Sequence, residues 1–183
     1  MGQELSRSLA RGLGRLIALV LAVLLVILIE RYCSLELPFL GPGAKTVSVD
    51  GDTIRAADGT GYRLFGIDAP ELQQTCTEAN GRSWHCGRAA KARLTRLMKG
   101  GNVICEGRAR DRFDRIVAIC RTETVPDLGE AMVRDGYAID LGGRAGHPYR
   151  DAEDEARSAQ RGIWRGPFDR PSDWRQANPR SGN

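Results

Sequence analysis

Three carboxylic acids stand near one another in this chain of 183 residues: Asp52, Asp68 and Glu71. They lie at the ends of two short apolar runs that flank a polar turn, within residues 50–71. Two such runs around a turn predict a β-hairpin, which would gather the three carboxylates at one end of a small sheet. Clustered carboxylates repel one another unless a cation lies among them. Hard oxygen ligands of this kind favour Ca²⁺ or Mg²⁺ over zinc.

Arg63 lies in the same stretch, and an arginine beside a metal site indicates a phosphate, because its planar fork of N–H donors matches phosphate oxygens. A plainer interpretation also exists, since Asp50–Gly51–Asp52 alone is typical of a turn with solvated acids. We expect Asp50 to shape this turn rather than to bind metal. Strict strand alternation places Arg63 and Asp68 on opposite faces, so the strand must twist, bulge or end before Asp68 if both are to reach one phosphate.

The chain resembles the staphylococcal nuclease (thermonuclease) family in a series of motifs that follow the family's order. The matching motifs are Asp50–Thr53, Arg63–Glu71, Asp111–Arg115, Glu130–Gly136 and Arg161–Trp164. The resemblance covers about residues 45–168 and indicates a membrane-anchored or exported bacterial member. It implies an α+β, mainly β fold: a five-stranded Greek-key OB-type barrel with three helices, preceded by an N-terminal hydrophobic anchor helix.

The same resemblance implies a reaction, the Ca²⁺-dependent hydrolysis of phosphodiester bonds in DNA, RNA or both, with little sequence preference. The carboxylates of Asp52 and Asp68 would hold the Ca²⁺ ion together with the backbone carbonyl of Ala69. The family usually has threonine at the position of Ala69. Because a carbonyl ligand does not depend on the side chain, this departure is mild.

The resemblance assigns three further residues to the reaction. Glu71 would orient or deprotonate the attacking water, while Arg63 and Arg115 would bind the phosphate in its transition state. The turn before Arg115 departs from the family pattern, with Asp114 in place of the usual glycine and Phe113 in place of a common tyrosine. Aspartate tolerates positive φ better than most residues, so we expect the turn to survive. The charge of Asp114, however, stands next to Arg115 and would compete with phosphate.

Two further observations concern binding and proton transfer. Gly142 stands where the family's best-known member has an aromatic base-stacking residue, so base contacts are not implied. His85 and His147 are the two histidines of the chain. We expect both on the surface, without a general-base role.

Five cysteines bear on the compartment and the topology. They are Cys33, Cys76, Cys86, Cys105 and Cys120. The last four lie in the part expected to be exported, which indicates two disulfides with three possible connectivities. A hairpin whose turn is centred on Arg112 and Phe113 brings Cys105 opposite Cys120, and this pairing leaves Cys76 with Cys86. Four free thiols in a cytosolic protein are the alternative, and Cys33 is either free or paired between chains.

The N-terminal part has a composition of its own. Residues 1–15 carry three arginines and one acid, and residues 16–29 are wholly apolar. This run of ~14 residues would form a helix of ~21 Å, whereas a helix needs ~20 residues to span a bilayer comfortably. No small-residue cleavage site follows, so we expect an uncleaved transmembrane signal anchor over residues 16–32, with secretion after signal cleavage as the alternative. The positive flank would stay in the cytoplasm and place the nuclease domain outside it, in the periplasm or the extracellular space.

The remaining chain divides by composition and periodicity. We expect a linker over residues 33–44, the folded domain over 45–168 and a flexible tail over 169–183. Amphipathic patterns predict helices over residues 87–98, 128–134 and 151–160. The basic outer face of the first is more typical of a solvated surface than of a nucleic-acid contact.

Two functions therefore stay open. The first is a membrane-tethered, monomeric, Ca²⁺-dependent endonuclease, and the net charge of +4 is compatible with such a polyanionic partner. The alternative is a catalytically inactive OB-type module, tethered to the membrane, that binds nucleic acid or protein. The joint presence of Arg63, Glu71 and Arg115 favours the enzyme, because a module without catalysis does not need all three.

Overall fold

The computed structural model describes most of the chain, in two units that span residues 1–36 and 37–183. The described residues are 17–25, 27, 39–40, 45–142 and 146–179. In the first unit, residues 17–25 are helical. No helix among the described residues is long and apolar enough to cross a membrane. The rest of the predicted anchor, at residues 16, 26 and 28–32, lies outside the described residues.

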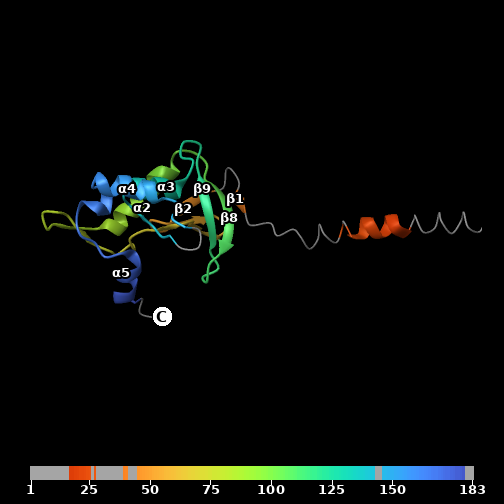
Figure 1. Cartoon of the computed structure of the whole chain (residues 1–183), viewed down its shortest axis with the longest axis horizontal. Coiled ribbons are helices and arrows are strands. Elements are labelled where there is room, and N and C mark those ends of the chain that lie inside the picture. Colours follow the sequence, from red (N-terminus) through yellow and green to blue (C-terminus); the bar gives the residue numbers. More distant parts are fainter. Residues whose placement is uncertain (1–16, 26, 28–38, 41–44, 143–145, 180–183) are drawn as a thin grey trace, which may run out of the picture. The chain divides into compact units, whose positions relative to one another are not determined.

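A six-stranded mixed sheet forms the body of the second unit (Figure 1). Its strands are β1 (Phe39–Leu40), β2 (Thr46–Ser48), β3 (Thr53–Ala56), β4 (Gly61–Leu64), β8 (Ile104–Arg110) and β9 (Ile116–Arg121). They follow the order β1-β8-β9-β4-β3-β2, in which β4 and β9 are parallel and every other pair is antiparallel. The β4–β9 pair thus joins the segment that carries the acids to a distant hairpin.

The α+β class is confirmed, but the pairing does not form the closed five-stranded barrel that we expected. Among the described residues the strand order is open, and β1 adds a sixth strand from within the predicted linker over residues 33–44. The short strand β5 (Ile67–Asp68) leaves the sheet and pairs with β10 (Ile139–Asp140). Gly66 lies between β4 and β5 with a φ of 72°, which glycine adopts without steric cost. This break separates β5 from the main sheet.

Helices pack against the sheet, and Figure 1 shows α2, α3 and α4 grouped together while α5 lies apart from them. Their bounds are α2 (Cys86–Met98), α3 (Leu128–Arg134), α4 (Arg150–Ser158), the 3-10 helix η1 (Gly162–Arg165) and α5 (Pro171–Ala177). The first three match the predicted helices within two residues at each end. The expected count of three was too low, because α5 forms in the tail that we predicted to be flexible. Pro171 at its start and Asp173 in its first turn favour a helix there.

One apolar core lies between the sheet and the helices. Its largest fully buried side chains include Ile54, Leu64, Leu94, Ile116, Leu128 and Met132. A smaller cluster forms beside it around Ile139 and Ile163, and Trp164 and Phe168 pack there edge to face with ring centroids 5.1 Å apart. Burial of this kind stabilises by about 25 cal/mol per Å² of apolar surface, so the core holds the elements that carry the polar residues.

Both predicted disulfides are present, Cys76–Cys86 and Cys105–Cys120, with Cα atoms 5.6 Å and 4.1 Å apart. Cys105 faces Cys120 across β8 and β9, as predicted. The first disulfide joins the start of α2 to β6 (Cys76–Thr77), which forms a small hairpin with β7 (Ser83–Trp84). Cys76–Cys86 therefore closes the segment that follows the predicted Arg63–Glu71 motif.

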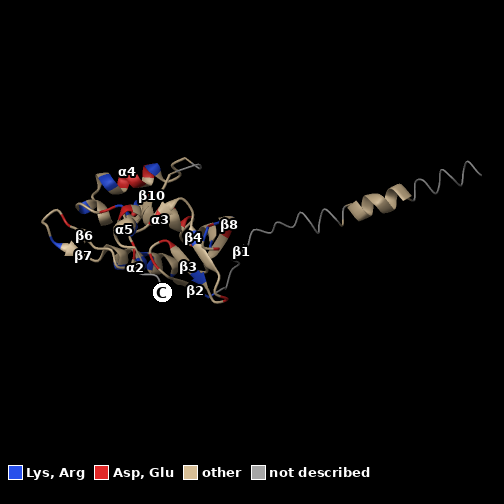
Figure 2. Ribbon diagram, turned by 90° about the horizontal axis from the view of Figure 1, so that it is seen from below, with Lys and Arg blue, Asp and Glu red and all other residues tan. Residues whose placement is uncertain are grey.

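Basic and acidic residues alternate with others along the ribbon of α4 (Figure 2). Glu153 and Arg157 lie one helical turn apart and pair at 3.7 Å, and Arg134 of α3 binds both Glu130 and Glu155. Exposed pairs of this kind contribute about 0–1 kcal/mol each. They define a solvated face rather than a site.

Candidate active site

Asp52 is the last residue of the turn at residues 50–52 and directly precedes β3. It is only 2% exposed. Its carboxylate binds the guanidinium of Arg63, and it accepts hydrogen bonds from the Thr53 hydroxyl at 3.1 Å and the Ala69 backbone N–H at 2.9 Å. Burial raises the pKa of Asp52 to about 7, against the opposing effect of Arg63. Asp50 accepts a hydrogen bond from the Asp52 backbone N–H at 3.1 Å, which is the turn-shaping role expected of it.

Arg63 connects the two buried aspartates. Besides Asp52, it binds Oδ1 of Asp68 through Nη2 at 2.8 Å. Strict alternation does not apply here, because β4 ends at Leu64 and the turn at Gly66 redirects the chain before Asp68. Burial alone would lower the pKa of Arg63, but the neighbouring Asp52 and Asp68 raise it above its ordinary value. Arg63 is thus a permanent positive charge between two carboxylates.

Glu71 lies at the rim of this cluster, and its side chain is 17% exposed. Its backbone is held from two sides. The fully buried Gln74 accepts a hydrogen bond from the Glu71 N–H at 3.1 Å, and a Cβ on Gly87 would lie 1.7 Å from the Glu71 carbonyl oxygen. Only glycine therefore allows the first turn of α2 to approach this segment so closely. Gln74 also donates to the carbonyl of Asp169 at 2.7 Å, which ties the Glu71 segment to the tail.

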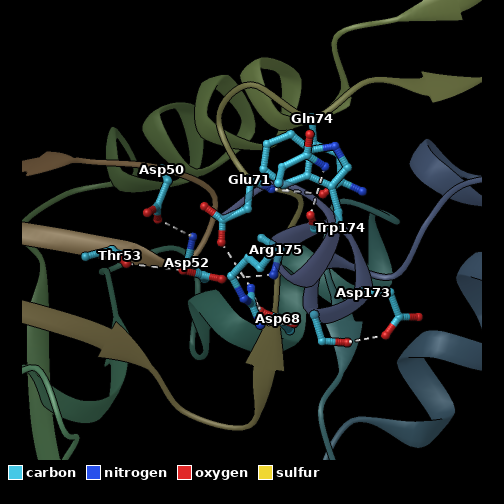
Figure 3. Close-up of polar contacts among 12 residues, drawn as sticks. Asp50, Asp52, Thr53, Asp68, Glu71, Gln74, Asp173, Trp174 and Arg175 are labelled. Atoms are coloured by element: carbon cyan, nitrogen blue, oxygen red, sulfur yellow. Dashed lines mark hydrogen bonds and ion pairs between the residues drawn. The ribbon is translucent and has the colours of Figure 1, made fainter. Parts of the chain in front are cut away.

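Arg175, which belongs to none of the motifs in the sequence, reaches from α5 into the carboxylates (Figure 3). Its Nη1 lies 3.0 Å from Oδ1 of Asp68 and 3.0 Å from Oε1 of Glu71, and its Nη2 lies 3.0 Å from Oδ2 of Asp68. Hydrogen bonds to Asp68 raise the pKa of Arg175, against the opposing effect of its partial burial. Pro171 and Asp173 signal the helix in the sequence, but nothing in their spacing signals where Arg175 points.

Arg115 lies at the edge of the cluster. It binds Asp111 through Nε at 2.8 Å and through Nη2 at 2.7 Å, and its Nη1 donates to the Thr53 hydroxyl at 3.3 Å. Asp114 has a φ of 61°, so the turn keeps the positive φ that suits the family's glycine at this position. Its carboxylate pairs with Arg110 at 2.8 Å rather than with Arg115. The acid that competes for Arg115 is therefore Asp111.

The surface near Arg115 carries an aromatic ring. Phe113 is 64% exposed at the tip of the β8–β9 hairpin, and the guanidinium groups of Arg112 and Arg115 lie 4.8 Å and 5.5 Å from its ring centroid. His85 and His147 are both exposed, as predicted.

The predicted cation ligands are Asp52, Asp68 and the carbonyl of Ala69. The donors are hard oxygens of the type that calcium takes, and the two carboxylates are 2% and 1% exposed, which disfavours their charge unless it is compensated. The residues present therefore fit a calcium ion in kind. In the part of the chain that the structure describes, no group of three or more His, Cys, Asp or Glu side chains forms a ready metal site. Instead, Arg63 and Arg175 hold the oxygens of Asp68.

Of the residues predicted for the site, the structure brings five into one connected group. These are Asp52, Arg63, Asp68, Ala69 and Glu71. Arg115 joins this group through Thr53. Such an arrangement presents fixed N–H donors and one partly exposed carboxylate to a ligand, which suits an anion undergoing attack by water.

Comparison with known proteins gives the following matches. A family model described as "Staphylococcal nuclease homologue" matches residues 62–166. Succinoglycan biosynthesis protein ExoI of Rhizobium meliloti (strain 1021) is 32% identical over 118 residues, which cover 64% of this chain and 61% of that protein. Probable endonuclease LCL3 is 30% identical over 125 residues in Schizophyllum commune (strain H4-8 / FGSC 9210) and 32% identical over 119 residues in Paracoccidioides brasiliensis (strain Pb03). These matches cover 56% and 57% of this chain, and 39% and 34% of the two LCL3 proteins, so the chain spans less than two thirds of each relative.

Proposed function

Because the chain belongs to the staphylococcal nuclease family, whose model matches more than half of it, we propose that its folded part hydrolyses phosphodiester bonds in DNA, RNA or both, with little sequence preference. The observation that carries the proposal is the convergence of Arg63 and three carboxylates in one network. Those carboxylates belong to Asp52, Asp68 and Glu71. Two of the relatives have endonuclease names, which agrees with this activity, while the third is named for succinoglycan biosynthesis.

Each side chain then has a role that its surroundings support. Glu71 accepts a proton from the attacking water or orients it, and its partial exposure lets water and substrate reach it. Arg63 and Arg115 bind phosphate oxygens and stabilise the charge that develops on them. Arg115 contacts Thr53, which in turn contacts Asp52, so a phosphate held by both arginines would lie beside the carboxylates.

Asp52, Asp68 and the Ala69 carbonyl would hold the Ca²⁺ ion. When bound, this ion supplies positive charge that offsets the charge of the phosphate in the transition state. The chain contributes a rigid frame, in which the Ala69 N–H and the Thr53 hydroxyl fix the carboxylate of Asp52. Fixed ligands of this kind need no rearrangement during the reaction.

The proposal is tested by digestion of single- and double-stranded DNA and RNA with the full chain, with Ca²⁺ titrated against a chelator. We expect activity to disappear in excess chelator and to return with Ca²⁺. Full activity in the chelator would contradict the calcium requirement. A protein that retains nucleic acid but cuts none of it would instead be a binding module, the alternative function.

Calcium binding is tested separately by calorimetry. Asp68→Asn removes one formal charge from the ligand set, so we expect its affinity for Ca²⁺ to fall. Asp58→Asn is the matched control, because Asp58 is exposed and its carboxylate binds the backbone N–H of Thr60 in a turn. Equal affinities in the two variants would exclude Asp68 as a ligand.

We also propose that this domain works as a monomer outside the cytoplasm, tethered to the membrane through residues 16–32. The two disulfides support an oxidising compartment. Cell fractionation with labelling of free thiols tests this location. Reduced cysteines in a cytoplasmic fraction would contradict it.

A further inference from the structure

Asp68 has little capacity left for another ligand. Its Oδ1 accepts N–H groups from Arg63 at 2.8 Å and from Arg175 at 3.0 Å, and its Oδ2 accepts a second N–H from Arg175 at 3.0 Å. A carboxylate oxygen offers about two lone-pair sites, so Oδ1 is fully occupied. The side chain of Asp68 is also only 1% exposed, so a cation cannot approach its oxygens directly from solvent. A cation that binds Asp68 through Oδ1 must therefore displace a guanidinium group.

Of the two arginines, Arg175 is the one that can leave. The side chain of Arg63 is 17% exposed and is held by Asp52 as well as by Asp68. Arg175 is 41% exposed and lies on the seven-residue helix α5, close to the C-terminal end of the chain. Its release exposes a guanidinium that is already partly solvated and leaves Arg63 in place between the two aspartates.

We propose that Arg175 is an internal competitor for the cation: it occupies Asp68 and Glu71 in the metal-free protein and leaves them when Ca²⁺ binds. This inference rests on the proposed function, because it concerns the same carboxylates. Its consequence is a coupling of two events. Since Nη1 of Arg175 contacts both acids, the displacement that opens Asp68 to the cation also removes this arginine from Glu71. Glu71 therefore loses its contact with Arg175 when the cation binds.

The helix does not have to unfold for this exchange. The backbone ahead of α5 is anchored by the hydrogen bond from Gln74 to the carbonyl of Asp169, and Pro171 is buried. A rotation of the Arg175 side chain suffices to separate it from the carboxylates. The arginine therefore stays near the site and returns when the cation is removed.

Calorimetric titration of the full chain with Ca²⁺ tests the proposal. Loss of a competing, charge-assisted contact should tighten binding, so we expect Arg175→Gln to have a Kd roughly tenfold lower than that of the parent. Arg175→Lys keeps the charge but cannot form the two-pronged contact, and its Kd should lie between the two. Arg121→Gln is the control for loss of one positive charge, because Arg121 is exposed at the far end of β9 from Arg115.

A second readout follows the arginine itself. The guanidinium N–H resonances of Arg175, assigned by their loss in Arg175→Gln, should change in the parent at the Ca²⁺ concentration that saturates binding. Unchanged or weaker Ca²⁺ binding in Arg175→Gln would overturn the proposal, as would resonances that do not respond to Ca²⁺. If the parent cuts nucleic acid and binds Ca²⁺ as tightly as Arg175→Gln, the competition fails while the proposed function stands. If neither protein binds Ca²⁺, the competition and the calcium requirement fail together, and digestion in chelator then decides the hydrolytic activity.

Discussion

At the scale of single residues, the two arginines proposed to bind phosphate, Arg63 and Arg115, differ in how much the fold depends on them. Arg63 separates two nearly inaccessible carboxylates, so its removal leaves buried like charges without compensation. Arg115 pairs with Asp111 where both side chains are partly exposed, at 28% and 18%. Variants of Arg63 therefore mix a loss of stability with any loss of activity. Arg115 therefore gives the cleaner test of the proposed phosphate binding.

We predict that Arg115→Ala cuts nucleic acid roughly 10²–10³ times more slowly than the parent, because loss of one fixed donor to a developing oxyanion has an effect of that size. The free energy of unfolding should fall by only about 1 kcal/mol, since both partners of the lost ion pair keep contact with solvent. Initial rates at saturating Ca²⁺ and chemical denaturation measure the two quantities.

The matched control for this variant is Arg110→Ala on the same hairpin, which removes the exposed pair with Asp114. It should keep a rate within about threefold of the parent, because that pair is exposed and Arg110 has no assigned role. Equal losses of rate in the two variants would show that hairpin charge in general, rather than Arg115, is responsible. Arg115→Lys should recover only part of the rate, since an ammonium group cannot form the bidentate contact.

At the scale of elements, the start of α3 depends on one side chain. Asp127 accepts hydrogen bonds from the backbone N–H groups of Gly129 at 2.8 Å and Glu130 at 3.1 Å, which caps the helix. It also accepts a hydrogen bond from the hydroxyl of Tyr149 at 2.8 Å. Burial and the charge of Asp127 raise the pKa of Tyr149, so the hydroxyl stays protonated and donates this hydrogen bond. Asp127 therefore joins α3 to the residue that precedes α4.

We predict that Asp127→Ala lowers the free energy of unfolding by about 1–2 kcal/mol, through loss of the cap and of the Tyr149 hydrogen bond. Asp154→Ala, at an exposed position on α4, should change it by less than about 0.5 kcal/mol. Denaturation curves of the two variants give the comparison. A similarly small change in the free energy of unfolding of both variants would mean that water replaces the cap without loss of stability.

In the β8–β9 hairpin, the local sequence predicts the cysteine pairing correctly but not the centre of the turn. The expected pairing of Cys105 with Cys120 is correct, but the turn is centred differently. Three residues, 112–114, lie at its centre instead of two, and a β-bulge between Gly107 and Ala109 restores the register farther along the strands. The two departures cancel at the cysteines. Bulges depend on the twist of the whole sheet, so the turn residues alone do not predict them.

The carboxylate cluster was predictable because its residues lie within one short segment with a distinctive spacing. Arg175 and Gln74 were not, for a physical reason. Each acts through a contact with a segment that is distant in sequence: Arg175 with Asp68, and Gln74 with Asp169. Hydrophobic periodicity and turn chemistry describe local structure, and α5 is a short helix whose position depends on tertiary packing.

At the scale of the whole molecule, the two disulfides have different relations to the site. Cys105–Cys120 joins two adjacent strands inside the main sheet, where both cysteines are fully buried. Cys76–Cys86 closes the segment that follows Gln74 and ends beside Gly87, and both of these residues contact Glu71. Loss of Cys105–Cys120 should therefore affect stability alone, and loss of Cys76–Cys86 should affect both stability and the geometry of the site.

We predict that replacing either pair of cysteines by serine lowers the free energy of unfolding by about 2–4 kcal/mol. The variant without Cys76–Cys86 should in addition show a lower rate of cleavage at a temperature where it is fully folded. The variant without Cys105–Cys120 serves as its control and should retain the parental rate there. Parental rates in both folded variants would mean that Gln74 and Gly87 hold Glu71 without help from the disulfide.

The parallel pairing of β4 with β9 has a kinetic consequence. It places Tyr62 beside Ile116, over fifty positions away in the sequence, and Arg63 beside Val117. The hairpins on either side form from local contacts, but this pair requires closure of a long loop, which is slow. During refolding from denaturant, circular dichroism should therefore recover before cleavage activity does. A newly made chain would pass through a stage in which most of its strands have formed but the cleavage activity proposed for it has not yet appeared.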